Sequence, residues 1–360
     1  MSRTEVQQEL IKKSLSFFKM KKRGLLDITM RTGKTVCTLK LLKDMKYTQK
    51  KILIAYADSR IKNGWISDQE KFDITLGDVT YTNFSSLKKY TEDKWDFFIC
   101  DEPQDLSENE YGYTQSIVEN SKYCLFLTGT VTSVLEERLM EMDVGTIAKY
   151  SKDQAIKDGI VADYKVTIHR VNLDNVKRTK NKKGKMVTEK NTWDAYTAVI
   201  EKLKKEKKDI SFLTIHRNRL SQNSIAKRNK ILQLLKDLKD KRVLVFTGLI
   251  KQSEGLGIPF FHSKCKDESA IWEFNQGEFN HLALANAGKV GATYENLDSI
   301  ILSNFVGNDA SNRQLLDRCA KLDYADKISD MHIICLNEPS EIKKLMKTLD
   351  KLDQTKIKWI

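Results

Sequence analysis

The sequence predicts an α/β protein with two parallel sheets in tandem. Three observations carry this prediction. Short apolar runs alternate with amphipathic segments between residues 25 and 130, and the same alternation returns between residues 242 and 336. Such alternation is typical of parallel sheets that helices cover on both faces. In the first half, the polar residues that stand out follow directly after apolar runs, which is where ligands bind in such sheets.

Length and composition agree with this class. The 360 residues suit two domains of ordinary size, and 40% hydrophobic residues suffice for packed cores. We place domain 1 at residues 1–160 and domain 2 at residues 161–360. The second domain is expected to end in an amphipathic helix at residues 341–352.

The sequence shows no membrane or export signal. It has no run of about 18 apolar residues, and its N-terminus lacks the apolar core of a secretory signal. The six cysteines form no CxxC pair, and Cys100, Cys124 and Cys335 lie in apolar, strand-like runs. We therefore expect buried reduced thiols, no structural zinc or disulfide framework, no membrane partner and a cytosolic location.

The net charge points to a polyanionic partner. The chain has 62 Lys and Arg residues against 49 Asp and Glu residues, which gives a formal charge of +13. Such an excess favours nucleic acid. Lys-rich solvated surfaces produce the same excess, so charge alone leaves both interpretations open.

A helix is expected first, at residues 5–18, because its apolar residues share one face. Gln7 lies near its start. A glutamine amide can contact an adenine edge with a donor and an acceptor together. A solvent-exposed glutamine is the alternative, which the helix pattern alone would favour.

The first chemical motif follows the apolar run at residues 25–28, which predicts a buried strand. A tight turn with Gly33, Lys34 and Thr35 comes next, and an amphipathic helix follows. This order predicts a phosphate-binding loop, in which N–H groups at the helix start attract an anion. Lys34 would reach the β- and γ-phosphates, and the Thr35 hydroxyl would bind Mg²⁺. Ile28 stands where the full motif has its first glycine, so a plain turn-to-helix junction is the alternative.

The second motif lies at the end of another predicted strand, residues 97–100, after a strand at 51–56 and a short strand with a turn at 79–87. Asp101 and Glu102 stand at its carboxyl end. Asp101 would hold Mg²⁺ through a water molecule, and Glu102 would polarise the attacking water. Acidic residues that end a strand are often only a solvated turn, but their position after the lysine-containing loop favours the catalytic interpretation.

Further along, residues 123–130 predict a strand that ends in small hydroxylated residues. Residues 131–162 are expected to be helical and connecting, and a strand is expected at 165–171. The segment 177–190 is the most basic and nearly lacks apolar residues. We expect an exposed loop or hairpin tip there, which either contacts phosphates or is a disordered, solvated insertion.

The second alternation begins with an expected helix at residues 224–240. Gln314, Arg318 and Lys321 are spaced four and three residues apart, so they share one helix face. Such a triplet is either a solvated face or a set of side chains that reach a γ-phosphate held by the other domain. Strands are expected at residues 242–248, 258–262, 282–286, 299–304 and 331–336.

Taken together, these motifs resemble those of superfamily 2 helicases and translocases, nearest to the branch of the phage protein UvsW and the restriction-enzyme subunits. The resemblance covers residues 5–335 and includes AIKDGIVADYKV, which is similar to this branch's segment between the two domains. The six motifs, in family order, are MRTGKT (I), DEPQ (II), LTGT (III), VLVFTG (IV), AGKVGATYENLDSIILSN (V) and NRQLLDRCAK (VI).

The resemblance implies two RecA-like domains with ATP and Mg²⁺ in the cleft between them. The implied nucleotide-binding residues are Gln7, Thr32, Gly33, Lys34, Thr35, Asp101 and Gly291, with Thr35 and Asp101 on the metal. The implied catalytic residues are Lys34, Asp101, Glu102, Gln314, Arg318 and Lys321, with Arg318 as the arginine finger. Gln104 and residues 128–130 would couple hydrolysis to movement. The implied nucleic-acid contacts are Tyr81, Thr82, Asn83, Thr247 and Thr293.

Four motifs depart from the family pattern. Motif I has Arg31 where glycine is common, and motif II has Pro103 and Gln104 in place of Ala-His. Motif V has Thr293 in place of an acid, and motif VI lacks its glycine and ends in Lys321 rather than arginine. The triplet keeps its charges, so we expect an active but slow ATPase, because lysine cannot make a bidentate guanidinium contact.

Three hypotheses of function follow. The first is an ATP-dependent helicase or translocase that remodels DNA in repair, recombination or replication, in a bacterial or phage-infected cytosol, with a protein partner that supplies specificity. The second is the same motor on RNA, which is less favoured because the resembled branch acts in DNA repair and restriction. The third is a non-catalytic nucleic-acid-binding or loading module with a degenerate ATP site, which the motif departures favour. A nuclease is disfavoured because no second acid-rich motif accompanies DEPQ.

Overall fold

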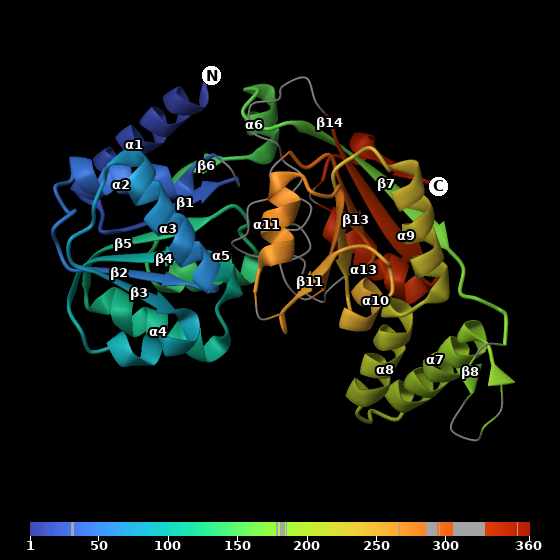
Figure 1. Cartoon of the computed structure of the whole chain (residues 1–360). Helices are drawn as coiled ribbons and strands as arrows, with labels where there is room; N and C mark the ends of the chain where they lie inside the picture. The colour runs from blue at the N-terminus through green and yellow to red at the C-terminus, as the bar shows by residue number, and fades with distance from the viewer. Residues whose placement is uncertain are drawn as a thin grey trace. The chain divides into compact units, whose positions relative to one another are not determined.

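The chain forms an α/β protein with two large sheets, in two compact units that divide between Asp163 and Tyr164 (Figure 1). Every pairing recorded between described strands of these two sheets is parallel. The predicted fold class of two tandem parallel sheets is therefore confirmed. This computed structural model describes residues 1–29, 32–177, 179–180, 184, 186–265, 267–285, 294, 296–304, 328–350 and 352–360.

The first unit has a six-stranded sheet in the order β3-β2-β4-β5-β1-β6. Its strands are β1 (Arg23–Ile28), β2 (Ile52–Tyr56), β3 (Val79–Asn83), β4 (Trp95–Asp101), β5 (Ser121–Thr128) and β6 (Gly145–Tyr150). Its helices are α1 (Arg3–Met20), α2 (Lys34–Asp44), α3 (Ser59–Phe72), η1 (Phe84–Tyr90), η2 (Pro103–Asp105), α4 (Glu108–Glu119), α5 (Ser133–Glu141) and α6 (Lys152–Lys157). Because the strands are parallel, their carboxyl ends lie at the same edge of the sheet.

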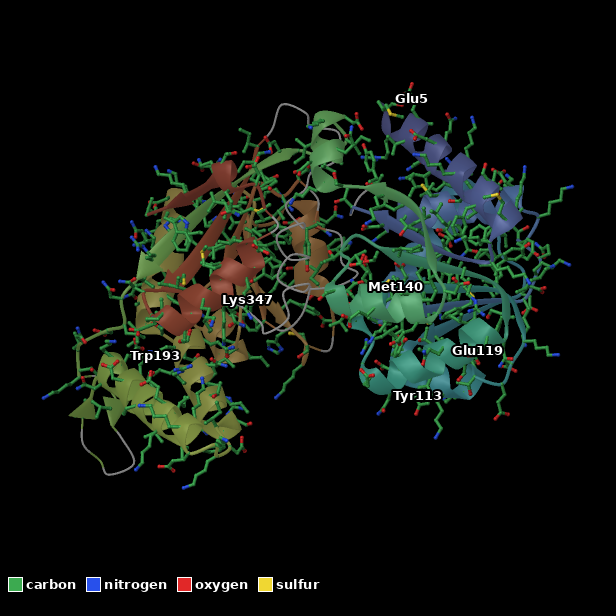
Figure 2. The ribbon with its side chains drawn as sticks, turned by 180° about the vertical axis from the view of Figure 1, so that it is seen from behind. Glu5, Tyr113, Glu119, Met140, Trp193 and Lys347 are labelled. Atoms are coloured by element: carbon green, nitrogen blue, oxygen red, sulfur yellow. The ribbon has the colours of Figure 1, made fainter. Side chains whose placement is uncertain are left out.

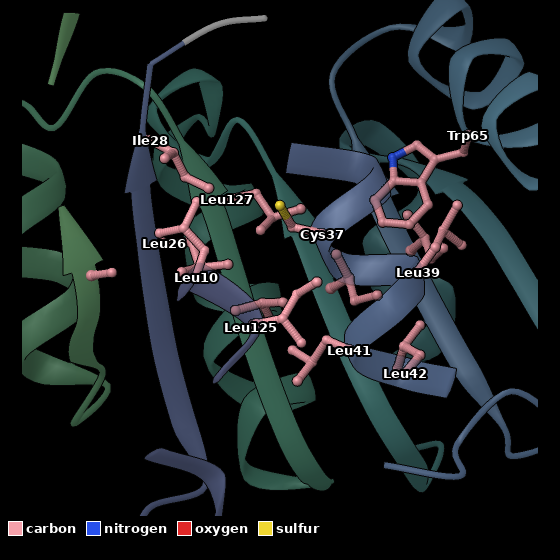
Figure 3. Close-up of a cluster of buried hydrophobic side chains, with 14 of the residues drawn as sticks. Leu10, Leu26, Ile28, Cys37, Leu39, Leu41, Leu42, Trp65, Leu125 and Leu127 are labelled. Carbon is pink, nitrogen blue, oxygen red and sulfur yellow. The ribbon is translucent and has the colours of Figure 1, made fainter. Parts of the chain in front are cut away.

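The first sheet is buried on both faces, as its nearly continuous apolar strands predict. Successive residues of a strand face opposite sides, so Ile52 and Ile54 join one core cluster and Leu53 and Ala55 join the other. The first cluster contains residues of α1, α2 and α3, and the second contains residues of η1, α4 and α5. Figure 3 shows side chains of α2 and Leu10 of α1 among those of β1 and β5.

Strand β6 differs from the expectation that residues 131–162 are helical and connecting. The segment does contain α5 and α6, but Gly145–Tyr150 between them pairs with β1. Its burial alternates at the end, with Ala148 and Tyr150 buried and Lys149 exposed. An edge strand contacts one neighbour only, so half of its residues can be polar, and it lacks the apolar run that marks the central strands.

The second unit has a seven-stranded sheet in the order β11-β12-β10-β13-β14-β7-β15. Its strands are β7 (Asp163–Val171), β10 (Val243–Thr247), β11 (Phe260–His262), β12 (His281–Ala285), β13 (Ser299–Leu302), β14 (Ile328–Leu336) and β15 (Ile357–Trp359). Its helices are α7 (Glu189–Lys205), α8 (Ser211–Gln222), α9 (Ile225–Asp237), α10 (Ile250–Glu254), α11 (Ser269–Gln276), α13 (Pro339–Leu349) and η3 (Gln354–Lys356). The helix α9, the five strands expected after it and the helix α13 are all present.

Two features of the second unit lie outside the strand–helix alternation. In the basic segment 177–190, β8 (Thr179–Lys180) pairs antiparallel with β9 (Met186–Val187), which agrees with a hairpin tip. Helices α7 and α8 lie side by side beyond the sheet of their own unit (Figures 1 and 2). The sequence pattern did not reveal this helical pair.

None of the described helices combines the length with the apolar character that crossing a membrane requires. The thiols of Cys37, Cys100, Cys124 and Cys335 are free and buried. Burial raises the pKa of the Cys37, Cys124 and Cys335 thiols to about 12, so these groups stay protonated and act as small apolar side chains.

Candidate nucleotide site

The carboxyl ends of β1, β4 and β5 gather the residues that the sequence singled out in the first unit. The three strands are neighbours in the order β4-β5-β1. The loop with Lys34 follows β1, Asp101 ends β4 with Glu102 next to it, and Thr128 ends β5. A single edge of one sheet therefore carries the residues of motifs I, II and III.

The loop after β1 is held by hydrogen bonds to its own backbone and to α1. The Thr32 hydroxyl donates to the Thr29 carbonyl oxygen over 3.0 Å. The Gln7 amide donates from Nε2 to the Thr32 carbonyl oxygen, also over 3.0 Å. Gln7 is buried, so its side-chain amide supports the loop from the interior of the unit. Met30 and Arg31 lie outside the described residues.

Gly33 is needed at its position for two reasons. Its φ of +97° lies in the left-handed region that L side chains rarely adopt. A Cβ atom built there would also lie 2.4 Å from Nε2 of Gln7. A larger residue would therefore strain the backbone and displace the amide that braces the loop.

Helix α2 begins immediately after Gly33, with Lys34 and Thr35 as its first two residues. Its first turn contains no acidic side chain, and no side chain caps it. The first N–H groups of a helix have no partner within the helix, and the helix dipole makes this end positive. Both Lys34 and Thr35 are partly buried. This helix start is therefore suited to a phosphate group.

Asp101 is buried at the end of β4, where its Oδ2 atom accepts a hydrogen bond from Nε1 of Trp65 over 3.0 Å. Burial raises the pKa of Asp101 to about 6, and the charge of Glu102 adds to this effect. The Lys34 charge and the indole hydrogen bond act in the opposite direction. A second carboxyl nearby, on Asp105, has its pKa raised to about 6 by burial and by the charge of Glu102.

Glu102 is held in an unusual backbone conformation. Its φ is +59° and its ψ is +58°, and its N–H donates to the Leu127 carbonyl oxygen over 2.8 Å. Left-handed conformations of residues other than glycine are sparse and concentrate at functional sites. The conformation brings the Glu102 side chain, which is mostly buried, to Lys34.

A chain of polar contacts then joins the three strand ends. Lys34 forms an ion pair with Oε1 of Glu102. Oε2 of Glu102 accepts from Nε2 of Gln104 over 2.8 Å, and Oε1 of Gln104 accepts from the Thr128 hydroxyl over 2.8 Å. The Thr130 N–H donates to the same hydroxyl over 3.0 Å. A change at Lys34 can therefore reach β5 through three direct contacts.

The donor set fits one Mg²⁺ ion shared with a phosphate. Asp101 offers a carboxylate, and Thr35 offers a hydroxyl in the first turn of α2. In the part of the chain that the structure describes, no group of three or more His, Cys, Asp or Glu residues could hold a metal ion alone. Mg²⁺ commonly takes one or two protein ligands and completes its shell with phosphates and water.

The sequence analysis did not single out Trp65, which has a polar role at this site. Trp65 is fully buried, and its indole also fixes one oxygen of Asp101. It reaches that carboxylate because α3 follows β2, and β2 pairs with β4 so that Tyr56 lies beside Asp101. No sequence motif indicates this contact, since it depends on how α3 crosses the sheet.

The expected nucleic-acid contacts of the first unit lie on β3. Asn83 is exposed, and Tyr81 is half-buried, with its hydroxyl accepting from Gln69 over 2.6 Å. Thr82 is buried. Only Tyr81 and Asn83 therefore present side chains to solvent at this strand end.

Of the expected nucleotide and nucleic-acid contacts in the second unit, Thr247 is among the described residues and the others are not. Thr247 ends β10, is buried, and donates to the Leu284 carbonyl oxygen over 3.3 Å. The candidates that lie outside the described residues are Gly291, Thr293, Gln314, Arg318 and Lys321.

Comparison with known proteins identifies the fold. No protein-family model matches the sequence, and no curated protein matches it either. Among solved structures, the chain is similar to the ATP-dependent Type ISP restriction-modification enzyme LlaBIII bound to DNA, with a TM-score of 0.62 and 12% identity. The chain has the fold of the matched part of this enzyme.

The extent of this likeness limits it to the fold. The match covers 98% of this chain but only 31% of the restriction enzyme, so the chain spans less than a third of that enzyme. A second similar structure is a DEAD box protein from the hyperthermophile Methanococcus jannaschii. That match covers 96% of this chain and 90% of the DEAD box protein, at 14% identity and a TM-score of 0.46. The likeness to LlaBIII agrees with the fold that the sequence-based resemblance implied.

Proposed function

We propose that the chain is a nucleic-acid-stimulated ATPase that moves along or remodels DNA, as a helicase or translocase. The observation that carries this proposal is the contact chain from Lys34 through Glu102 and Gln104 to Thr128, beside Asp101. It joins a phosphate-binding lysine, a water-activating carboxylate and a strand end that can move, all at one edge of a parallel sheet.

The residues of the first unit divide the chemistry among them. The backbone of residues 32–35 and the Lys34 ammonium group bind the phosphates of ATP. Asp101 and Thr35 hold Mg²⁺, which when bound neutralises phosphate charge. Glu102 accepts a proton from the attacking water, and Gln7 contacts the adenine as well as the loop.

The ion pair between Lys34 and Glu102 determines the order in which these residues act. The Lys34 ammonium group cannot hold Glu102 and the β- and γ-phosphates equally well, because both are anions that compete for one cation. Arrival of the triphosphate therefore draws Lys34 away and leaves the Glu102 carboxylate available as the base. Gln104 and Thr128 contact Glu102 directly or through one residue, so they respond to this exchange.

The second domain supplies the remaining roles by motif position. Gln314, Arg318 and Lys321 contribute positive charge and a hydrogen-bonding amide to the γ-phosphate, with Arg318 as the arginine finger. Gly291 and Thr293 respond to nucleotide and nucleic acid together. Tyr81, Asn83 and Thr293 contact the strand, whereas the side chains of Thr82 and Thr247, which the motifs also imply, are buried.

DNA is the proposed polymer. The net charge of +13 supports a nucleic acid, and the motifs resemble those of the UvsW and restriction-subunit branch. LlaBIII, the similar solved structure, is bound to DNA. We place the protein in the cytosol of a bacterium or of a phage-infected host, where a protein partner supplies part of its specificity.

The test compares Lys34→Ala with Lys43→Ala, an exposed lysine of the same helix. Lys34→Ala is expected to lower DNA-stimulated phosphate release by about 100-fold or more, because it removes the phosphate-binding cation, and to leave DNA affinity unchanged. Lys43→Ala is expected to hydrolyse ATP like the wild type. Wild-type hydrolysis by Lys34→Ala would reject the proposal.

The choice of DNA is tested with the wild-type protein. Phosphate release is measured with single-stranded DNA, duplex DNA, forked DNA and RNA at equal nucleotide concentrations. Stronger stimulation by one of the DNA forms than by RNA is expected. The reverse order would assign the motor to RNA while leaving the ATPase assignment intact.

A further inference from the structure

Helices α7 and α8 carry an apolar surface that their own unit leaves exposed. Three large apolar side chains on the pair are exposed: Val199 at 45%, Phe212 at 67% and Ile215 at 49%. On the inner side, Trp193 is buried and packs with Leu173 and Leu336. The pair thus has a packed face toward its unit and an apolar face toward solvent.

The exposed face contains an array of three rings. The Tyr196 and His216 rings are stacked across the two helices, with centroids 6.2 Å apart and planes at 16°. The Phe212 ring meets His216 edge-on, with centroids 4.3 Å apart. Phe212 is therefore supported from one side and still has most of its surface in solvent.

Positive charge surrounds these rings. Residues 199–219 contain seven Lys and Arg residues against three Asp and Glu residues. Around the turn between the helices, Lys202, Lys204, Lys205, Lys207 and Lys208 are all exposed.

The base of α8 is attached to the carboxyl edge of the second sheet. Nε2 of Gln222 donates to Oδ1 of Asn304, two residues after β13, over 3.1 Å. The Ser221 hydroxyl donates to Oε2 of Glu341 over 2.7 Å, and Glu341 forms a buried ion pair with Lys227. Lys227 in turn donates to the Ser303 carbonyl oxygen over 3.0 Å. The C-terminal end of α8 is therefore fixed to the sheet edge at which such folds bind ligands, and the exposed rings lie further along the helical pair.

We propose that this surface, which consists of Tyr196, Val199, Phe212, Ile215 and the exposed lysines 202–208, binds single-stranded nucleic acid. An unpaired base stacks on Phe212, and the neighbouring phosphates lie against the lysines. This inference rests on the proposed function and adds a strand-binding site outside its motifs. A duplex is excluded from the stacking contact because its base faces are already covered.

The combination of rings and lysines decides in favour of a strand over an apolar protein partner. Aromatic side chains in a positively charged surface are how proteins bind single strands without sequence preference, since every base has a π-face. An apolar partner would cover the rings but would also remove water from the neighbouring lysines, of which Lys208 already pairs with Glu206, without supplying anions for the others. A single strand satisfies both parts of the surface.

The test uses the full chain and poly-dT oligonucleotides of about 20 nucleotides that carry one 2-aminopurine at successive positions. Phe212→Ala is expected to weaken binding about tenfold and to abolish the fluorescence change at one position. Phe212→Trp is expected to restore both, because it restores the ring. Met346→Ala, which removes another exposed apolar side chain of the same unit, is the control and is expected to bind like the wild type.

A second variant tests the charges and does not depend on Phe212. Lys204→Ala with Lys205→Ala is expected to reduce the slope of log affinity against log salt by roughly 1.4, at about 0.7 for each phosphate contact. An unchanged slope would overturn the role of the lysines. Repeating the measurement with poly-rU shows whether the surface distinguishes DNA from RNA.

The outcomes separate this inference from the proposed ATPase. If the wild type hydrolyses ATP with DNA while Phe212→Ala binds the oligonucleotide normally, the surface assignment is overturned and the ATPase assignment stands. If Lys34→Ala hydrolyses ATP normally while Phe212→Ala still weakens binding, the reverse holds. A dimer that Phe212→Ala dissociates, with unchanged oligonucleotide binding, would assign the surface to a second copy of the chain.

Discussion

Lys34 of the loop after β1 and Glu102 at the end of β4 form an ion pair across the strand that separates β1 from β4 in the sheet. Their side chains are only 12% and 11% exposed. Ion pairs that are shielded from water are strong when intact and costly when one partner is lost. The proposed base is thus held by the cation that the triphosphate needs, so binding and activation compete for one side chain.

Replacing Glu102 with glutamine is expected to separate binding from hydrolysis. Glutamine keeps the shape but cannot take a proton from water, so turnover should fall by about 100-fold or more. ATP affinity should stay equal or increase, because Lys34 no longer has to leave a carboxylate. Steady-state phosphate release and fluorescent-nucleotide binding measure the two effects.

Glu119→Gln is the matched control, since Glu119 is exposed on α4 (Figure 2). It is expected to keep wild-type turnover. Turnover of Glu102→Gln within a few-fold of the wild type would show that Glu102 is not the base.

Gly33→Ala and Gly64→Ala are expected to change stability in opposite directions. At Gly33 the left-handed backbone alone costs about 1–2 kcal/mol for any other residue, and the clash with Gln7 adds to it. At Gly64, inside α3, a Cβ atom meets nothing within 4 Å, so alanine should stabilise by about 0.5–1 kcal/mol. Urea unfolding measures both, and equal destabilisation by the two would contradict the geometry at Gly33.

Trp65→Phe is expected to raise the Mg²⁺ concentration needed for half-maximal ATPase activity. The substitution keeps a six-membered aromatic ring at this position but removes the indole N–H that fixes Oδ2 of Asp101. Loss of a hydrogen bond to a metal-binding side chain commonly reduces metal affinity about 10–100-fold. The measurement is a Mg²⁺ titration at saturating ATP and DNA.

The control for Trp65 is Trp95→Phe. Trp95 is also buried in the first unit, but its indole lies near the Tyr90 carbonyl oxygen, away from Asp101. Its Mg²⁺ requirement should match the wild type. A similar increase in both variants would trace the effect to general loosening of the core.

The pair His169 and His332 predicts acid sensitivity in the second unit. Their Nε2 and Nδ1 atoms lie 3.0 Å apart, and burial, followed by the neighbouring His332 and Lys230, lowers the pKa of His169 to about 4. The ordinary pKa of a histidine is 6.5, so between pH 4 and pH 6.5 the unfolded chain binds a proton that the folded chain does not. The His169 contribution to stability is therefore complete above pH 6.5 and is lost as the pH falls toward 4.

His169→Gln should flatten this dependence because an amide does not titrate. The free energy of unfolding in urea is compared at about pH 7.5 and about pH 4.5 for both proteins. The wild type should lose more stability than the variant between the two conditions. Equal losses would show that folding does not lower the pKa of His169.

Much of the site followed from the sequence because parallel strands collect their carboxyl ends at one edge. Once Lys34, Asp101 and Thr128 were placed after strands, their gathering at that edge followed from the fold class. The direct contact between Lys34 and Glu102 did not follow, since it depends on the left-handed backbone at Glu102. Residues with a Cβ atom rarely adopt that conformation, and no local pattern indicates it here.

Three other features depended on packing that sequence patterns do not record. The Trp65 contact depends on the crossing of α3 over the sheet, and β6 is an edge strand with too few apolar residues to stand out. In α7 and α8, only Trp193 and Ile200 among the large apolar residues are deeply buried. Few apolar residues therefore mark a buried helix face over residues 189–222.

The buried cluster of Ser221, Lys227 and Glu341 holds the C-terminal end of α8 rigidly against its unit. Two opposite charges in a dry interior resist being drawn apart, because neither has water to replace the other. A force applied to the outer ends of α7 and α8 would therefore be transmitted to Ser303 and Asn304 with little deformation. Force on a bound strand would displace the end of β13, so the helical pair would transmit that force to the second sheet.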